Sequence, residues 1–207
     1  MAPERVDLGH GCLIDHLPAF LPGPDADRMF AAITATTTWA QEHMRMYGRD
    51  VAVPRLSAWY GEPDRSYTYS GITMASQPWT RPLSEVRSRI LAAVGERSNS
   101  VLVNLYRSGR DGVAWHSDDE AELGVDPVIA SVSLGATRRF VLRDRQDKSR
   151  RHEMELAHGS LVLMRGRTQA LWDHQVPKTA SRVGARINLT YAAVTAPISG
   201  RIGRSLV

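Results

Sequence analysis

Short apolar runs separated by polar turns dominate the chain from Ser100 onwards. Each run is rich in Val, Ile, Leu or Tyr and is bounded by Gly, Asp, Ser or Pro, which is typical of β-strands joined by turns. The runs are VLVNLY, PVIASVSLG, RRFVLR, HEMELA, SLVLM and RINLTYAAV. This pattern predicts an antiparallel sandwich or barrel.

Two helical patterns precede these strands. Apolar residues recur at helical spacings from Asp25 to about Glu42, and again from Pro82 to Val94. Because the helices come before the strands rather than between them, we expect a mainly β fold with N-terminal helices.

Length and composition predict a single domain. The chain has 207 residues, of which 43% are hydrophobic and 23% charged, and its mean hydropathy is −0.29. This is enough for a buried core, and no apolar run is long enough to span a membrane. We expect N-terminal helices and a nucleotide-recognition lid over residues 1–99, a core over 100–193 and a basic tail over 194–207. The lone Cys12 cannot form an internal disulfide, so we expect a cytoplasmic protein, and we expect it to be a monomer.

Charge is distributed unevenly along the chain. Residues 1–135 contain 12 basic and 17 acidic side chains, whereas residues 136–207 contain 14 basic and 5 acidic ones. Almost all basic residues are arginines, which suit bidentate contacts with phosphate groups. A basic second part indicates either an anionic partner or a solvated basic face, and charge alone leaves both open.

His116 and Asp118 are two residues apart, so on a strand their side chains would leave the same face. His174 offers a third ligand in LWDHQVP, where a short apolar run meets a proline. Two histidines and one carboxylate form the facial triad of non-haem Fe(II) oxygenases. The alternative is that His116 is a hydrogen-bonded surface residue near a turn.

Arg186 and Asn188 would share one face of a strand in ARINLTY. An inward-facing guanidinium needs a carboxylate partner, and no acidic residue follows residue 173. A bound dicarboxylate is one such partner. The alternatives are an acidic residue from the earlier part of the chain, or an Arg186 that points outward.

Six motifs occur in order along the chain: NLY, WHSDDE, IASVSLG, AHGSLVLM, DHQVP and RINLTY. Together they resemble the AlkB family of Fe(II)- and 2-oxoglutarate-dependent dioxygenases, which remove alkyl groups from nucleobases. The resemblance covers roughly residues 40 to 192. Through VPR at residues 53–55 and YTYSG at residues 67–71, it is closest to the branch that acts on bases in duplex DNA. It implies a double-stranded β-helix, or jelly roll.

The resemblance also implies a site for metal and cosubstrate. It makes His116, Asp118 and His174 the iron ligands. It makes Arg186 the partner of the distal carboxylate of 2-oxoglutarate, with three neighbours lining the same pocket, Asn104, Tyr106 and Asn188. One position departs from the family, because Ala192 stands where a second arginine usually helps to hold the cosubstrate. Either Arg182 or another basic side chain then supplies that charge, or 2-oxoglutarate binds more weakly.

The resemblance also implies a set of residues that recognise the damaged base. By resemblance, Tyr69 stacks on the flipped base with Tyr67 beside it, and Glu120 meets the polar edge of the damaged base. A carboxylate there favours cationic lesions such as 1-methyladenine and 3-methylcytosine. Arg55, in the VPR motif, is assigned to the substrate as well. Without the family, tyrosines packing in a hairpin and an exposed Glu120 would explain the same residues.

Contacts with the rest of the nucleic acid are expected from two regions. Tyr47 falls where duplex-acting relatives carry an aromatic finger that fills the gap left by the flipped nucleotide. The basic tract from Arg143 to Arg151, together with Lys178 and Arg182, contains candidates for binding phosphates.

We therefore expect an oxidative demethylase that uses Fe(II), 2-oxoglutarate and O2 to hydroxylate N-alkyl groups on DNA bases, with release of formaldehyde. Its partner would be alkylated DNA, single-stranded or duplex. The alternatives are an RNA or tRNA demethylase of the same chemistry, a non-catalytic nucleic-acid-binding relative, suggested by Ala192, and a protein hydroxylase, which the basic second part disfavours.

Overall fold

The computed structural model describes residues 3–46, 48–62, 66–69 and 72–195. Two antiparallel sheets and two hairpins account for its strands. The larger sheet contains, in spatial order, β1 (Glu4–Gly9), β2 (Cys12–Leu17), β13 (Leu161–Gly166), β10 (Ile129–Gly135), β15 (Arg186–Ala192), β8 (Ser100–Tyr106) and β5 (Leu56–Gly61). The smaller sheet contains β12 (Arg151–Leu156), β11 (Arg138–Asp144), β14 (Trp172–Val176) and β9 (Val113–His116). The hairpins pair β3 (His43–Met46) with β4 (Arg49–Ala52), and β6 (Ser66–Tyr69) with β7 (Ile72–Ala75).

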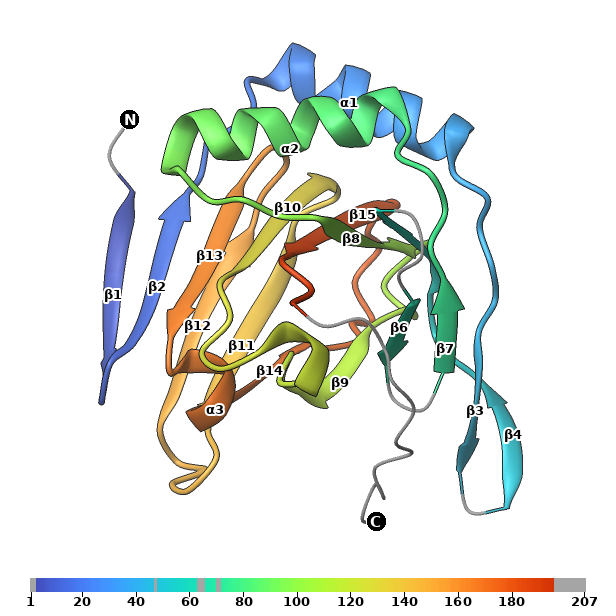
Figure 1. Cartoon of the computed structure of the whole chain (residues 1–207). Coiled ribbons are helices and arrows are strands. Elements are labelled where there is room, and N and C mark those ends of the chain that lie inside the picture. The colour runs from blue at the N-terminus through green and yellow to red at the C-terminus, as the bar shows by residue number, and fades with distance from the viewer. Residues whose placement is uncertain (1–2, 47, 63–65, 70–71, 196–207) are drawn as a thin grey trace.

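Two helices cover the outer face of the larger sheet, α1 (Gly23–Thr36) and α2 (Arg81–Val94) (Figure 1). Two short helical turns, η1 (Ala121–Leu123) and α3 (Thr168–Leu171), lie in connections near the smaller sheet. Helix α1 ends at Thr36, before the position near Glu42 that the apolar spacing predicts. The reason is the run Thr36-Thr37-Thr38, because β-branched side chains lose rotamer freedom in a helix. None of the described helices is long and apolar enough to cross a membrane.

The larger sheet is buried on both faces, and this arrangement creates the interior of the domain. On β15, Ile187 and Leu189 pack in the cluster that faces the helices. The strand alternation therefore turns Arg186 and Asn188 toward the smaller sheet. A second apolar cluster, which includes Leu102 of β8, fills much of the space between the sheets. Polar residues in a buried strand thus gather at the centre of the molecule.

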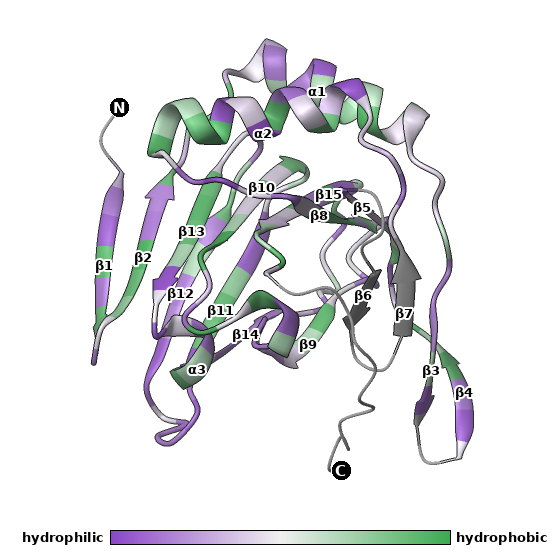
Figure 2. Cartoon of the chain, in the orientation of Figure 1, coloured by the Kyte–Doolittle hydropathy of each residue, from purple (hydrophilic) through white to green (hydrophobic). Residues whose placement is uncertain are grey.

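Mainly antiparallel strands with helices on one outer face confirm the expected fold class, and the arrangement is consistent with a jelly roll. Three strands from before residue 100, namely β1, β2 and β5, also join the larger sheet. Figure 2 shows β13 as largely hydrophobic and the loop between β11 and β12 as hydrophilic. The hydrophilic loop continues the basic tract found in the sequence.

Candidate metal and cosubstrate site

Strand pairing brings His116, Asp118 and His174 together. His116 at the end of β9 lies opposite His174 of β14, and their ring centroids are 4.2 Å apart. Nε2 of His174 lies 3.6 Å from Oδ2 of Asp118, and Nε2 of His116 lies 3.9 Å from Oδ1 of Asp118. One potential ligand atom from each residue lies within 4.8 Å of the others. This set matches the facial triad that binds Fe(II) and leaves coordination positions open.

Burial changes the pKa values of two members of this triad, Asp118 and His174. Burial raises the pKa of the Asp118 carboxyl, although the nearby His116 acts in the opposite direction. Burial, followed by the charges of His116 and Arg145, holds the pKa of His174 well below its usual range. His174 is therefore a neutral imidazole, the form that binds metal ions. A divalent cation would offset the cost of ionising Asp118 in this buried position.

Backbone contacts orient the first histidine and the aspartate. Nδ1 of His116 lies 2.8 Å from the carbonyl oxygen of Ala114. An Nδ1–H donated to that carbonyl makes Nε2 the ring nitrogen of His116 that can bind a metal. The backbone N–H of Asp118 donates to Oε1 of the buried Gln169 at 2.9 Å.

Arg186 supplies a buried cation on β15, two residues before Asn188. Its side chain is completely buried, and burial lowers the pKa of its guanidinium to about 10. Nη2 donates to Oγ of Ser133 at 2.8 Å and to Oδ1 of Asn188 at 2.9 Å. Nε and Nη1 of Arg186 have no hydrogen-bond partner among the described residues. An unused donor on a buried guanidinium favours an anionic acceptor, such as the carboxylate at the distal end of 2-oxoglutarate.

One small cavity of about 40 Å³ joins these elements. It is lined by the three triad residues and by the three further cosubstrate candidates, Asn104, Tyr106 and Asn188. The Cζ atom of Arg186 lies 5.1 Å from the ring centre of Tyr106, at the edge of this group. Thr190, which the strand spacing places on the same face as Asn188, lines the cavity as well. Sequence reasoning missed Ser131, because only the pairing of β10 with β15 places it opposite Thr190.

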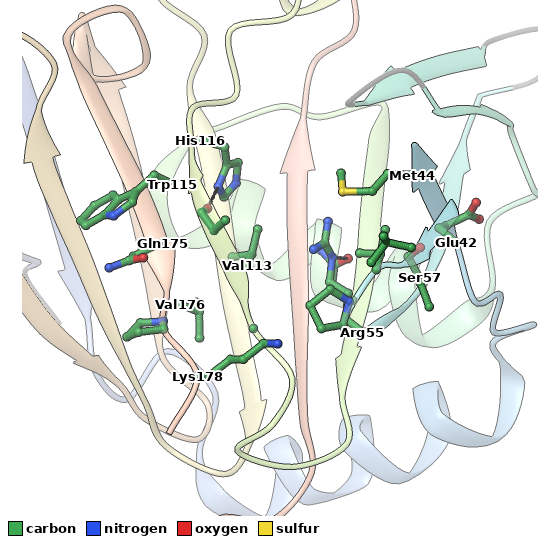
Figure 3. Close-up of a pocket in the computed structure, with 18 of the residues that line it drawn as sticks. Glu42, Met44, Arg55, Ser57, Val113, Trp115, His116, Gln175, Val176 and Lys178 are labelled. Atoms are coloured by element: carbon green, nitrogen blue, oxygen red, sulfur yellow. Dashed lines mark hydrogen bonds between the residues drawn. The ribbon is translucent and has the colours of Figure 1, made fainter. Parts of the chain in front are cut away.

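A larger pocket of about 600 Å³ lies beside His116. Figure 3 shows Arg55 and Met44 on one side of it, with His116, Trp115 and Lys178 on the other. Arg55 is buried, lines both this pocket and the small cavity, and donates from Nε to Oδ1 of Asn104 at 2.9 Å. His116 of the triad therefore lines a pocket large enough for a nucleobase.

Several substrate and cosubstrate candidates are not brought to these two cavities. Arg182 is exposed and lines neither, and Glu120 is half-buried and also lines neither. Tyr67 and Tyr69 lie on β6, whose side chains are outside the described part of the structure, and Tyr47 is not among the described residues.

A small cavity lies next to Ala192, the position at which the family usually has a second arginine. Ala192, Asp118 and Thr190 are among the residues that line this space of about 20 Å³. The charge of Arg55 opposes the rise that burial causes in the pKa of Asp118, after the larger opposing effect of His116. Arg55 is thus a described arginine whose charge acts on Asp118, whereas Arg182 lines neither cavity.

The arginines of the β11–β12 region are engaged within the protein. Arg143 and Arg145 both form ion pairs with Asp173, at 3.0 and 3.1 Å. Arg150 forms an ion pair with Asp144 at 2.9 Å. The expected phosphate contacts from this tract would have to compete with these pairs.

Comparisons with known proteins agree with the geometry. Residues 14–191 match the family model described as the 2OG-Fe(II) oxygenase superfamily. An alpha-ketoglutarate-dependent dioxygenase alkB homolog 3 from Bos taurus is 42% identical over 86% of this chain and 64% of its own length. The DNA oxidative demethylase ALKBH2 from Mus musculus is 36% identical over 82% of this chain and 75% of its own length.

A solved structure, titled "The structure of OsALKBH1", shares the fold. Its TM-score is 0.59 at 18% identity, and the match covers 86% of this chain and 97% of that one. The chain spans less than two thirds of the length of the Bos taurus relative, at 64%. The motifs, the triad and these matches agree, and the chain belongs to the AlkB family within the 2OG-Fe(II) oxygenase superfamily.

Proposed function

We propose that this protein is an Fe(II)- and 2-oxoglutarate-dependent dioxygenase that removes N-alkyl groups from DNA bases of the 1-methyladenine and 3-methylcytosine type. The observation that carries the proposal is the small cavity lined by a histidine–aspartate–histidine triad, together with the buried Arg186, which donates to Asn188 of the cavity wall and has unused donors. The names of two relatives support it, since one is a dioxygenase and the other a DNA oxidative demethylase.

Each group in the cavity has a role in this reaction. His116, Asp118 and His174 would hold Fe(II), and Arg186 would bind the distal carboxylate of 2-oxoglutarate. When bound, these cofactors couple the decarboxylation of 2-oxoglutarate by O2 to hydroxylation of the alkyl carbon, and a hydroxymethyl product then releases formaldehyde.

The protein itself contributes position and exclusion of water. Asn104 is held by Arg55, and Asn188 is held by Arg186, so two amides of the cavity wall have fixed orientations. Arg55 reaches both the cavity and the larger pocket, and it therefore links the cosubstrate side to the substrate side. Valines, leucines and prolines make up much of the larger pocket, which favours a flat, desolvated base close to His116.

The test is turnover of defined substrates by the wild-type chain and by His116→Ala. Wild-type protein with Fe(II), 2-oxoglutarate and O2 should release succinate and formaldehyde from methylated DNA, and the variant should release neither while keeping its thermal unfolding midpoint. Methylated single-stranded DNA, duplex DNA and RNA are compared in parallel. Activity restricted to RNA would overturn the substrate assignment. Binding of nucleic acid without any succinate release would overturn the reaction and favour a non-catalytic relative.

A further inference from the structure

Backbone pairing alone does not fix the segment that carries Asp118. Strand β9 ends at His116, so Asp118 lies beyond its last residue. The ladder between β9 and β14 is irregular between His174 and Val176. Side-chain contacts must therefore contribute to the distance between Asp118 and the two histidines.

Arg145, the residue after β11, is attached to the segment that leads to His174. Its backbone N–H donates to the carbonyl oxygen of Leu171 at 2.9 Å, and its Nη1 donates to that of Ala170 at 3.3 Å. Its Nε donates to Oδ1 of Asp173 at 3.1 Å. Asp173 directly precedes His174, so these contacts place the guanidinium against the start of β14.

The same guanidinium reaches the residues on both sides of Asp118. Nη2 of Arg145 donates to Oγ of Ser117 and, at 2.8 Å, to Oδ2 of Asp119. The planar fork of an arginine can hold such partners in one fixed arrangement, which a lysine cannot do. One side chain thus connects three residues, each adjacent in sequence to a residue of the triad.

We propose that Arg145 is a positioning residue that holds the Asp118 segment against β14 and thereby sets the geometry of the metal-binding triad. The inference rests on the proposed function only through the metal site. Groups that orient metal ligands typically change metal affinity by about 10- to 100-fold when they are removed.

A matched control lies on the neighbouring strand. Arg139 of β11 forms an ion pair with Glu153, in which both side chains are largely exposed. Neither partner contacts the triad or its sequence neighbours in the described structure. Exposed pairs of this kind contribute little to stability, so Arg139→Met removes the same charge without the proposed role.

The experiment measures Mn(II) affinity by calorimetry on protein without 2-oxoglutarate or nucleic acid. We expect Arg145→Met to bind Mn(II) at least about 10-fold more weakly than wild type. Arg145→Lys should bind with intermediate affinity, and Arg139→Met should bind like wild type. The visible spectrum of bound Co(II) reports the coordination geometry, and it should change in Arg145→Met but not in Arg139→Met.

Asp119→Ala tests the same contact if Arg145→Met does not fold, because it removes one of the two contacts from Arg145 to the Asp118 segment and leaves those to the β14 side. We expect Asp119→Ala to weaken Mn(II) binding, and the Arg145→Met and Asp119→Ala effects to be non-additive in the double variant. Equal Mn(II) affinities in wild type, Arg145→Met and Asp119→Ala would overturn the role of Arg145. Failure of the wild-type chain to bind Mn(II) would instead overturn the metal site, and with it the proposed function.

Discussion

Burying an arginine without a carboxylate partner among the described residues is costly, so its presence needs a physical explanation. Arg186 is such a group, with Nε and Nη1 unused among the described residues. The cost is offset when a carboxylate enters the cavity. If Arg186 binds the acidic cosubstrate as proposed, it trades stability of the empty protein for that binding, as functional sites commonly do.

This trade predicts opposite effects of Arg186→Met on stability and binding. The empty variant should unfold at a temperature equal to or higher than that of wild type, because an unpaired buried charge has been removed. It should also lose about 100-fold or more in 2-oxoglutarate affinity, since hydrogen bonds to charged groups contribute about 1.5–3 kcal/mol each. Thermal unfolding with and without 2-oxoglutarate measures both. A variant that is destabilised yet still stabilised by 2-oxoglutarate would contradict the assignment.

At the scale of elements, sheet pairing determines which polar residues meet. Sequence patterns predicted most of the strands from Ser100 onwards because they are short runs rich in Val, Ile, Leu and Tyr between turn residues, and they predicted His116 and Asp118 as a pair from their spacing. They could not predict Arg145, because its partners come from segments joined only by the fold. The edge strand β1 and the hairpin strands β3 and β4 are largely polar and exposed, so they carry little hydrophobic signal. The role of Tyr47 stays a prediction.

The buried carboxylate of Asp15, on β2, forms ion pairs with Arg5 of β1 and Arg165 of β13. These pairs predict a pH-dependent contribution to stability. Hydrogen bonding to Arg5, aided by Arg165, lowers the pKa of Asp15. A lowered folded-state pKa means that the stabilisation is present above the unfolded value of about 3.9 and is lost as the pH falls through the folded value. Asp15→Asn should therefore reduce the free energy of unfolding by about 1–3 kcal/mol at pH 7, and the difference from wild type should shrink below about pH 4.

Urea denaturation between pH 7 and pH 3 measures this difference. Glu155→Gln, which removes an exposed carboxylate of β12, is the matched control and should change stability little at any pH. A deficit in Asp15→Asn that is constant across the pH range would show that Asp15 stabilises the hairpin by packing rather than by charge.

The loop that contains Gly109 packs against the backbone at Thr179, and no space is left for a side chain at position 109. This predicts that a substitution of Gly109 lowers stability. A Cβ at Gly109 would lie 2.6 Å from the carbonyl oxygen of Thr179, which is rigid backbone. Gly109→Ala should therefore lower the free energy of unfolding by about 1–3 kcal/mol. Gly184→Ala is the control, because its Cβ would meet Ala136 at an ordinary 3.9 Å. Equal unfolding midpoints for the two variants would contradict this account of the loop packing.

For the whole molecule, the number of basic residues in the sequence exceeds the number that are available to bind an anionic partner. Residues 136–207 contain 14 basic side chains, yet many of those described are engaged in ion pairs with the protein's own carboxylates. The pairs are Arg139–Glu153, Arg143–Asp173, Arg145–Asp119, Arg150–Asp144 and Arg165–Asp15. Much of the basic tract therefore stabilises the domain, and this weakens the inference from net charge to an anionic partner.

The β3–β4 hairpin, in the acidic part of the chain, offers basic groups of a different kind. It extends away from the two sheets (Figure 1). Arg45 and Arg49 on it are exposed, and no ion pair found among the described residues involves either. Two available guanidinium groups beside the pocket that contains Met44 are suited to phosphates that flank a base bound there.

This contrast predicts which arginines control nucleic-acid binding. The double variant Arg45→Gln/Arg49→Gln should weaken binding to methylated DNA and reduce the slope of log affinity against log salt concentration by up to about 2, because each phosphate contact releases counterions. Arg139→Gln/Arg150→Gln removes the same charge from paired arginines, and it should leave the slope close to that of wild type. Fluorescence anisotropy across a salt series measures both variants. Equal losses of slope would mean that net charge, rather than available guanidinium groups on the hairpin, attracts the nucleic acid.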